Sequence, residues 1–259
     1  MARLTPAVMR ALDILELFVD GARLSGAEIM RRTGLPRTSA FELVNTLAAR
    51  GYLERDELGG YTLGARTLAL GNAYAARYDL VGEAGHCARR VAHQTGETCS
   101  VAILEGDEVF YLAKVEGREV MALISSVGKR APANATGLGK ALLAGLTPDQ
   151  VDALWPDGVL PALTEHTITT LPALQAELEA TRTRGYALER EESGPGVACV
   201  AAPIFDVAGR TPAAVSISVP LARWDQYPVA HWASIALDAA ASMSERLGHT
   251  PADAPTRVG

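Results

Sequence analysis

Three consecutive polar residues, Arg37, Thr38 and Ser39, have side chains suited to hydrogen bonding with the base edges and phosphates of duplex DNA. Arginine is the commonest specific reader of guanine, and serine and threonine hydroxyls bond phosphates or either base type. Glu42 follows one turn later and is able to accept from cytosine N4, although it repels phosphate. Flanking arginines that we expect to contact phosphates are Arg31, Arg32, Arg50 and Arg55.

A pair of short helices is predicted to carry this polar cluster. Ser25 and Glu28 form a capping-box pattern, in which each residue satisfies a free N–H of the other, and Gly34 ends the first helix. Pro36 begins the second helix, because its missing N–H would have no intrahelical partner there, and Gly51 ends it. The apolar residues of the second helix share one face, away from the polar cluster. They are Ala40, Val44 and Leu47, with Leu43 beside them.

A hairpin follows the helix pair, and a supporting helix precedes it. Residues 52–54 and 61–63 alternate like strands around a turn at 58–60, which is typical of a winged helix-turn-helix that places its second helix in the DNA major groove. Residues 6–20 are predicted to form a helix that supports the motif through Val8, Leu12, Leu15 and Val19. A purely structural motif stays open as an alternative, because eight arginines and eight acids leave residues 1–65 neutral, without a bulk basic footprint.

Composition limits the class of protein. With 259 residues and 48% hydrophobic residues, the chain is long enough for two globular domains. The net charge of −6 falls on residues 66–259, which are therefore not expected to contact nucleic acid or an anionic membrane. No apolar run or signal-peptide pattern predicts a membrane span or export, so a cytoplasmic location is expected. The three cysteines lack metal-ligand spacing, and we expect no disulfide framework, metal site or cofactor.

The remainder of the chain predicts a helix and then an α+β domain, with helices on the faces of a central antiparallel sheet. Residues 65–78, rich in Ala and Gly, are expected to form a linker helix that pairs with its copy in a second chain, although a simple spacer is the alternative. Strands are predicted at 98–104, 108–114, 120–125, 186–190, 199–206 and 213–219. Helices are predicted at 81–94, 137–145, 147–155, 171–184 and 229–247.

Two segments of this domain are candidates for binding a small molecule. Residues 134–141 look like a phosphate-binding loop but lack its first Gly and the Ser or Thr after Lys140, which leaves either a carboxylate site or close packing at the glycines. Ser216 and Ser218 lie two apart on one strand and face the same side. Together with Cys199, they predict a largely apolar pocket with a few polar groups.

A catalytic role has little support. Cys199 or a serine would need a general base, and the five histidines lie away from these strands in the sequence. His86 and His93 share a helix face, for which a solvated surface is the better interpretation than a metal site. The prediction is therefore a protein that is not an enzyme, with an enzyme or metabolite-binding module at Cys199 and Ser218 as the alternative.

From residue 6 to about 247 the chain resembles the IclR family of bacterial transcription regulators. Residues 34–39 resemble the entry to that family's recognition helix, and residues 128–144 and 191–205, followed by 214–219, resemble its effector-domain signatures. The resemblance implies a winged DNA-binding domain, a linker helix that drives dimerisation and a GAF-like effector domain. The corresponding boundaries are 1–64, 65–78 and 79–248, followed by a disordered tail at 249–259.

The resemblance also implies which residues form the effector pocket. Backbone N–H groups near Gly137 and Leu138, with the two serine hydroxyls, would hold a carboxylate, and Glu189 would accept from a ligand hydroxyl. The implied pocket residues are Ala131, Gly137, Leu138, Glu189, Cys199, Ser216 and Ser218, with Val120 as a wall. Glu42 departs from the family, which often has Arg there.

We therefore expect a transcriptional regulator that binds an operator in double-stranded DNA as a homodimer or tetramer and responds to a small-molecule effector, with no membrane partner. The sequence leaves open the effector, the target genes, the choice between dimer and tetramer, and whether the outcome is repression or activation.

Overall fold

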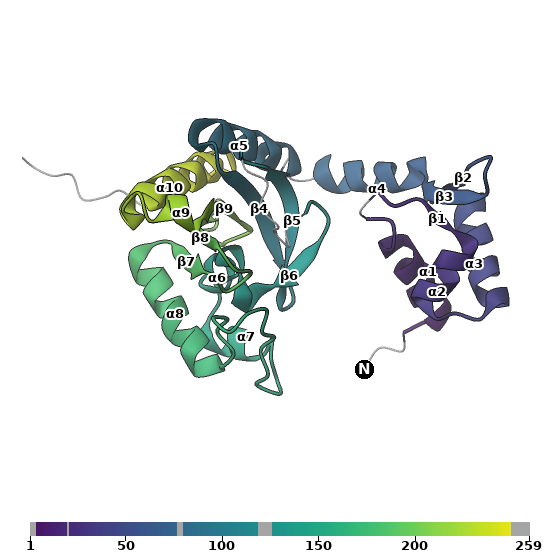
Figure 1. Cartoon of the computed structure of the whole chain (residues 1–259), viewed down its shortest axis with the longest axis horizontal. Coiled ribbons are helices and arrows are strands. Elements are labelled where there is room, and N and C mark those ends of the chain that lie inside the picture. The colour runs from purple at the N-terminus through teal and green to yellow at the C-terminus, as the bar shows by residue number, and fades with distance from the viewer. Residues whose placement is uncertain (1–3, 20, 77–79, 119–125, 250–259) are drawn as a thin grey trace, which may run out of the picture. The chain divides into compact units, whose positions relative to one another are not determined.

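The structure, a computed structural model, describes residues 4–19, 21–76, 80–118 and 126–249. The chain divides into two compact units, residues 1–79 and 80–259, each of which is described by itself (Figure 1). Three predictions lie outside the described residues: the strand at 120–125 with Val120, the end of the linker helix at 77–78 and the tail from residue 250. No helix in the described ranges is long and apolar enough to cross a membrane.

The first unit has the predicted winged helix-turn-helix architecture (Figure 1). Its strands form a small antiparallel sheet in the order β1-β3-β2, and the β2–β3 hairpin is the wing. The unit's elements are α1 (Pro6–Glu16), β1 (Leu24–Ser25), α2 (Gly26–Thr33), α3 (Arg37–Ala49), β2 (Leu53–Arg55), β3 (Gly60–Leu63) and α4 (Ala65–Ala76).

Both predicted ends of α2 are confirmed, and the start of α3 differs from the prediction by one residue. Ser25 and Glu28 form both hydrogen bonds of the capping box at the start of α2, and Gly34 ends that helix in the left-handed conformation. Pro36 is the N-cap of α3 and not its first residue. All three predicted core residues of α3, Ala40, Val44 and Leu47, are buried.

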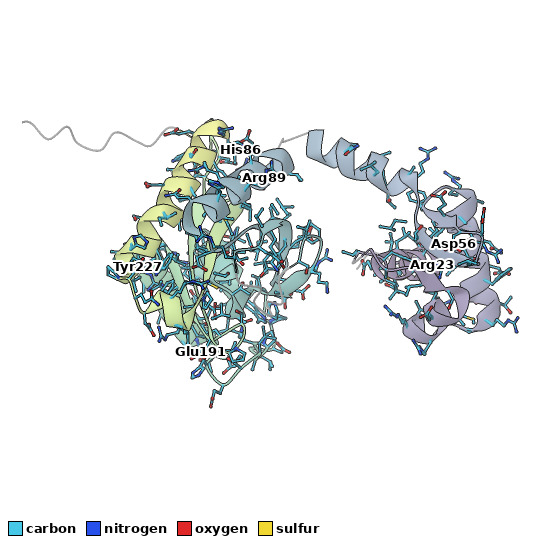
Figure 2. The ribbon with its side chains drawn as sticks, turned by 45° about the horizontal axis from the view of Figure 1, so that its top comes forward. Arg23, Asp56, His86, Arg89, Glu191 and Tyr227 are labelled. Carbon is cyan, nitrogen blue, oxygen red and sulfur yellow. The ribbon has the colours of Figure 1, made fainter. Side chains whose placement is uncertain are left out.

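Asp56 organises the turn of the wing. Its Oδ1 accepts hydrogen bonds from the backbone N–H groups of Leu58 and Gly60, and the Arg23 guanidinium forms a salt bridge with its carboxylate. Arg23 and Asp56 are labelled in Figure 2. The hydrogen bond from Arg23, together with those from the backbone, lowers the pKa of Asp56 to about 2. This carboxylate therefore serves the wing's own structure.

Three of the four predicted packing residues of α1 are wrong, and the fourth, Leu15, is half-buried against the core. Val8, Leu12 and Val19 are 42–55% exposed, whereas Ile14 and Phe18 are fully buried among the residues of α2, α3 and the wing. The helix ends at Glu16, so Phe18 reaches the core from the following turn and not from a continued helix. The side that faces the core was decided by the position of α2 and α3, which helical periodicity does not specify.

The second unit is an α+β domain, as predicted, built on one antiparallel sheet with the strand order β6-β5-β4-β9-β8-β7 (Figure 1). Three short elements were not predicted from the sequence: β6, the 3-10 turn η1 and α9. The strands are β4 (Thr98–Glu105), β5 (Glu108–Val115), β6 (Arg130–Pro132), β7 (Ala187–Arg190), β8 (Val197–Ile204) and β9 (Ala213–Pro220). The helices are α5 (Leu80–Thr95), η1 (Ala133–Ala135), α6 (Gly137–Leu143), α7 (Pro148–Asp152), α8 (Leu171–Arg184), α9 (Leu221–Trp224) and α10 (Val229–Arg246).

The two faces of this sheet have different cores. On one face, large residues such as Val215, Ile217 and Val219 of β9 pack against α5 and α10. On the other face the central strands present small or polar residues, including Ser216 and Ser218, beneath α6. Because side chains alternate along a strand, the small residues all leave space on the α6 side. The pocket described below lies there.

Candidate DNA surface and effector pocket

The polar start of α3 is accessible, as a DNA-reading surface requires. Arg37, Thr38 and Glu42 are exposed, and Ser39 is half-buried. The predicted phosphate contacts Arg31 and Arg32 are exposed on the last turn of α2, and Arg55 is exposed on the wing.

An open groove of about 420 Å³ lies between α2, α3 and the wing. Arg37 and Arg55 both line it, and the Arg55 guanidinium lies 5.8 Å from the centre of the Tyr61 ring. Phe41, which the sequence analysis did not single out, also lines the groove and is 61% exposed. The sequence does contain a sign of this exposure: Phe41 follows Ala40 directly and therefore lies off the apolar face of the helix.

In the second unit, six of the eight predicted pocket residues line one small cleft under α6, and four further residues join them. Ala131 does not line the cleft, because it is buried on β6 in the hydrophobic core. The cleft encloses about 20 Å³, room for one water molecule. Its lining consists of Gly137, Leu138, Glu189, Cys199, Ser216 and Ser218 as predicted, and Ser100, Tyr111, Thr136 and Ser193.

The sheet register brings the hydroxyls and the thiol together. Cys199 lies opposite Ser218, and its Sγ donates to Ser218 Oγ at 3.1 Å; Ser100 lies opposite Ser216. Burial, followed by the nearby Glu189 carboxylate, raises the pKa of the Cys199 thiol well above its usual value. Cys199 is therefore a protonated thiol, which is the inert form of a cysteine. Burial likewise raises the pKa of Tyr111.

Glu189 is the charged group of the cleft. Its side chain is 1% exposed at the middle of β7. One carboxylate oxygen, Oε1, accepts from the backbone N–H groups of Glu192 at 2.6 Å and Ser193 at 3.0 Å, which folds the β7–β8 loop over the cleft. The other oxygen, Oε2, is buried, and no group among the described residues forms a hydrogen bond with it; a polar neighbour is the Cys199 thiol, which lies opposite Glu189 in the sheet. A buried acceptor without a hydrogen bond lowers the stability of the fold. A bound molecule that donates a hydrogen bond to this oxygen would remove that penalty.

A buried ion pair connects the same loop to α6. Lys140 is 1% exposed, and its Nζ donates to Glu192 Oε1 at 2.6 Å. Burial raises the pKa of Glu192, and the Lys140 ammonium opposes that rise. The pair therefore ties the pocket loop to α6.

The two glycines at the start of α6 have different roles. A Cβ on Gly139 would lie 2.1–2.5 Å from the backbone of Ala133, so only glycine fits against the η1 turn. A Cβ on Gly137 would meet Cys199, Ala201 and Glu189 at 3.5–3.6 Å, which is ordinary contact distance. Close packing thus explains Gly139, whereas at Gly137 a methyl group would fit in contact with side chains that line the cleft.

Comparison with known families identifies the chain. Residues 72–245 match the model of the bacterial transcriptional regulator IclR C-terminal domain, and residues 7–57 match the IclR helix-turn-helix domain. The chain belongs to the IclR family. The IclR relatives include the HTH-type transcriptional regulator BhcR of Paracoccus denitrificans, which is 36% identical over 239 residues, covering 92% of this chain and 86% of BhcR.

Other IclR proteins agree over nearly the whole chain. The HTH-type transcriptional repressor AllR of Escherichia coli K12 is 31% identical, covering 93% of this chain and 90% of AllR. The crystal structure of an IclR homolog from Microbacterium hydrocarbonoxydans, complexed with 4-hydroxybenzoate, has a TM-score of 0.81 at 29% identity and covers 93% of this chain and 99% of that one. Thermotoga maritima IclR has a TM-score of 0.75 at 28% identity, covering 93% and 98%.

The functional class follows from this membership. The IclR protein described here is a DNA-binding transcriptional regulator with a ligand-binding C-terminal domain, and not an enzyme. The protonated, buried Cys199 agrees with that class. His86 and His93 are both exposed on α5, and the residues that the structure describes contain no group of three or more ligands that could hold a metal ion.

Proposed function

We propose that the cleft under α6 binds a small carboxylic acid that also carries a hydroxyl, and that this acid controls operator binding. The observation that carries the proposal is the buried Glu189 Oε2, which no described residue hydrogen-bonds, on a residue that lines the cleft together with Ser216 and Ser218. A ligand hydroxyl would donate to Glu189 Oε2, and the serine hydroxyls and the N–H groups at Gly137 and Leu138 would bond the carboxylate. The 4-hydroxybenzoate complex of the Microbacterium homolog supports this ligand chemistry.

Effector binding would also require movement. The cleft of about 20 Å³ is far too small for a hydroxy acid, so a ligand must separate α6 from the β7–β8 loop. A ligand that binds only the widened form shifts the population toward it. In this proposal, that widening is the conformational signal that reaches the DNA-binding unit.

The test combines titration calorimetry with DNA binding. A panel of hydroxy acids and matched acids without the hydroxyl is titrated into the full chain, and operator binding is followed by fluorescence anisotropy with and without each acid. The double variant Ser216→Ala and Ser218→Ala should lose the effector response and keep operator affinity. An undiminished response in the double variant would refute the pocket assignment.

For the operator, we propose that α3 enters the major groove with Arg37 on a guanine and with Thr38, Ser39 and Glu42 near base edges or phosphates. Arg31, Arg32 and Arg55 would contact the flanking phosphates. Arg37→Ala should cost about 1–3 kcal/mol and relax specificity at one base pair. An equal loss on operator and random DNA would instead make Arg37 a phosphate contact.

We further propose that the protein acts as a homo-oligomer in the cytoplasm, where its DNA target is. Apolar surface supports the oligomer: Leu68 and Leu70 of α4 are 66% and 59% exposed. A helix of 12 residues is marginal in water without a packed face, so a second copy of α4 would stabilise it. Leu68→Glu with Leu70→Glu should reduce the mass measured by light scattering, whereas Leu163→Glu, on the other unit, should not. An unchanged mass in the double variant would contradict pairing through α4.

A further inference from the structure

Phe41 is an aromatic residue that α3 does not use for its core. The apolar residues Ala40, Val44 and Leu47 of this helix are buried, and Leu43 is half-buried against the core. Phe41 is 61% exposed and does not belong to the hydrophobic cluster of its unit. Among the described residues of α3 it is the one large apolar side chain left on the surface. Folding of the unit therefore does not explain why this position carries a phenylalanine.

The position of Phe41 is that of a base-contacting residue. Thr38, Phe41, Glu42 and Asn45 are all exposed, and their spacing of three and four residues places them in one strip along the helix. Recognition helices contact base edges through side chains at such intervals. Phe41 thus lies between polar residues that are suited to base reading.

The surroundings of Phe41 favour DNA over an apolar protein partner. The groove next to it is lined by Arg37, one turn earlier on α3, and by Arg55 of the wing. Within the residues that the structure describes, neither arginine forms a salt bridge with a carboxylate. Two cations and an exposed aromatic ring on one groove suit a polyanion that also presents an apolar group. The major groove of DNA is such a surface, since each thymine displays its C5-methyl group there.

We propose that Phe41 is a specificity-determining residue that packs against the C5-methyl group of a thymine in the operator. The inference rests on the proposed entry of α3 into the major groove, and it adds an apolar reading element to the polar ones. It gives the operator a required thymine in each half-site, within reach of the base that Arg37 contacts.

The experiment removes the methyl group alone. An operator is selected from a random duplex library with the full-length protein, and each thymine is then replaced singly by deoxyuridine. At one thymine per half-site, the replacement should weaken binding about fourfold, the factor that corresponds to burying one methyl-sized group. Phe41→Ala should bind the thymine and deoxyuridine operators equally at that position. Phe41→Leu, which keeps an apolar side chain, should retain part of the difference.

The outcomes separate this inference from the proposed function. If no thymine replacement changes affinity, or if the difference persists in Phe41→Ala, the methyl contact is wrong while operator binding and its dependence on Arg37 still stand. If no operator is selected at all, the proposed function itself fails. Thermal unfolding confirms that Phe41→Ala folds, as expected for an exposed side chain, and Val159→Ala, exposed on the other unit, is the matched control.

Discussion

Replacing Lys140 by Met should destabilise the effector-binding unit, and the penalty should depend on pH. Met is close to Lys in length and needs no partner in the buried site. The substitution leaves Glu192 without a counter-charge, although its carboxylate stays largely buried, with a side chain that is 12% exposed. Breaking one half of a buried ion pair costs about 3–5 kcal/mol in general. The unfolding free energy of Lys140→Met should therefore fall by several kcal/mol near neutral pH.

An upper limit on this penalty follows from protonation. Without Lys140, the Glu192 carboxylate can bind a proton and become neutral. Protonating it costs about 1.36 kcal/mol for each pH unit above the ordinary Glu pKa of about 4.3, so the destabilisation does not exceed that cost. At pH 7 the limit is about 3.7 kcal/mol, and at pH 5 it is about 1 kcal/mol.

The direction of the pH effect follows from the change in the folded-state pKa. Without Lys140, the pKa of Glu192 in the folded state rises further, because the group that opposed the effect of burial is gone. A raised pKa means that the folded variant binds more protons than the unfolded chain between the two values. The variant therefore gains stability relative to the wild type as pH falls.

Urea unfolding followed by tryptophan fluorescence measures this penalty, because Trp155, Trp224 and Trp232 all lie in the second unit. Adding Glu192→Gln to Lys140→Met should recover most of the loss at pH 7. As a control, Arg246→Met breaks an exposed pair with Glu83 and should cost less than about 1 kcal/mol. An equal penalty at pH 5 and pH 7, or no recovery in the double variant, would refute this account.

Three further predictions address packing and the wing. Gly139→Ala should destabilise the second unit, because the new methyl group would lie 2.1–2.5 Å from backbone atoms of Ala133. Gly137→Ala should fold and block effector binding. Thermal unfolding measures the first effect and calorimetry the second. Ile14→Ala should cost about 2–5 kcal/mol of unfolding free energy in the first unit, and Leu12→Ala within about 0.5 kcal/mol, so similar losses in urea denaturation would contradict the observed packing of α1. Asp56 should titrate at about pH 2 by NMR. Its contribution to the stability of the wing is then complete above its ordinary pKa near 3.8 and is lost only as pH falls through about 2. Titration near 3.8 would show that its hydrogen bonds are absent in solution.

Local chemistry allowed much of the first unit to be predicted from the sequence. The capping box at Ser25, the stop at Gly34 and the buried face of α3 were all correct, because each depends on residues within one or two turns. Most of the predicted face of α1 was wrong, since Ile14 and Phe18 are selected by neighbouring helices and not by their own spacing. Phe41 was missed for a related reason: only its exposure distinguishes it from an ordinary core residue.

The pocket residues likewise separate into those that the sequence predicts and those that only the fold brings together. Motifs identified Glu189, Cys199 and the two serines, since strand alternation puts Ser216 and Ser218 on one face regardless of context. Tyr111 lies on β5, the hairpin partner of β4 that the turn at 105–107 predicts, whereas Ser100 joins the serines because β4 pairs with β9, which no local signal predicts.

The sequence by itself determined the family, the fold class and most polar residues of the proposed site, because those properties are carried by short motifs. The tertiary structure alone decided that Glu189 Oε2 has no hydrogen-bond partner in the described part of the chain, that Lys140 is buried against Glu192 and that Phe41 stays on the surface. These three properties depend on burial, and burial is set by the packing of segments that lie far apart in the chain.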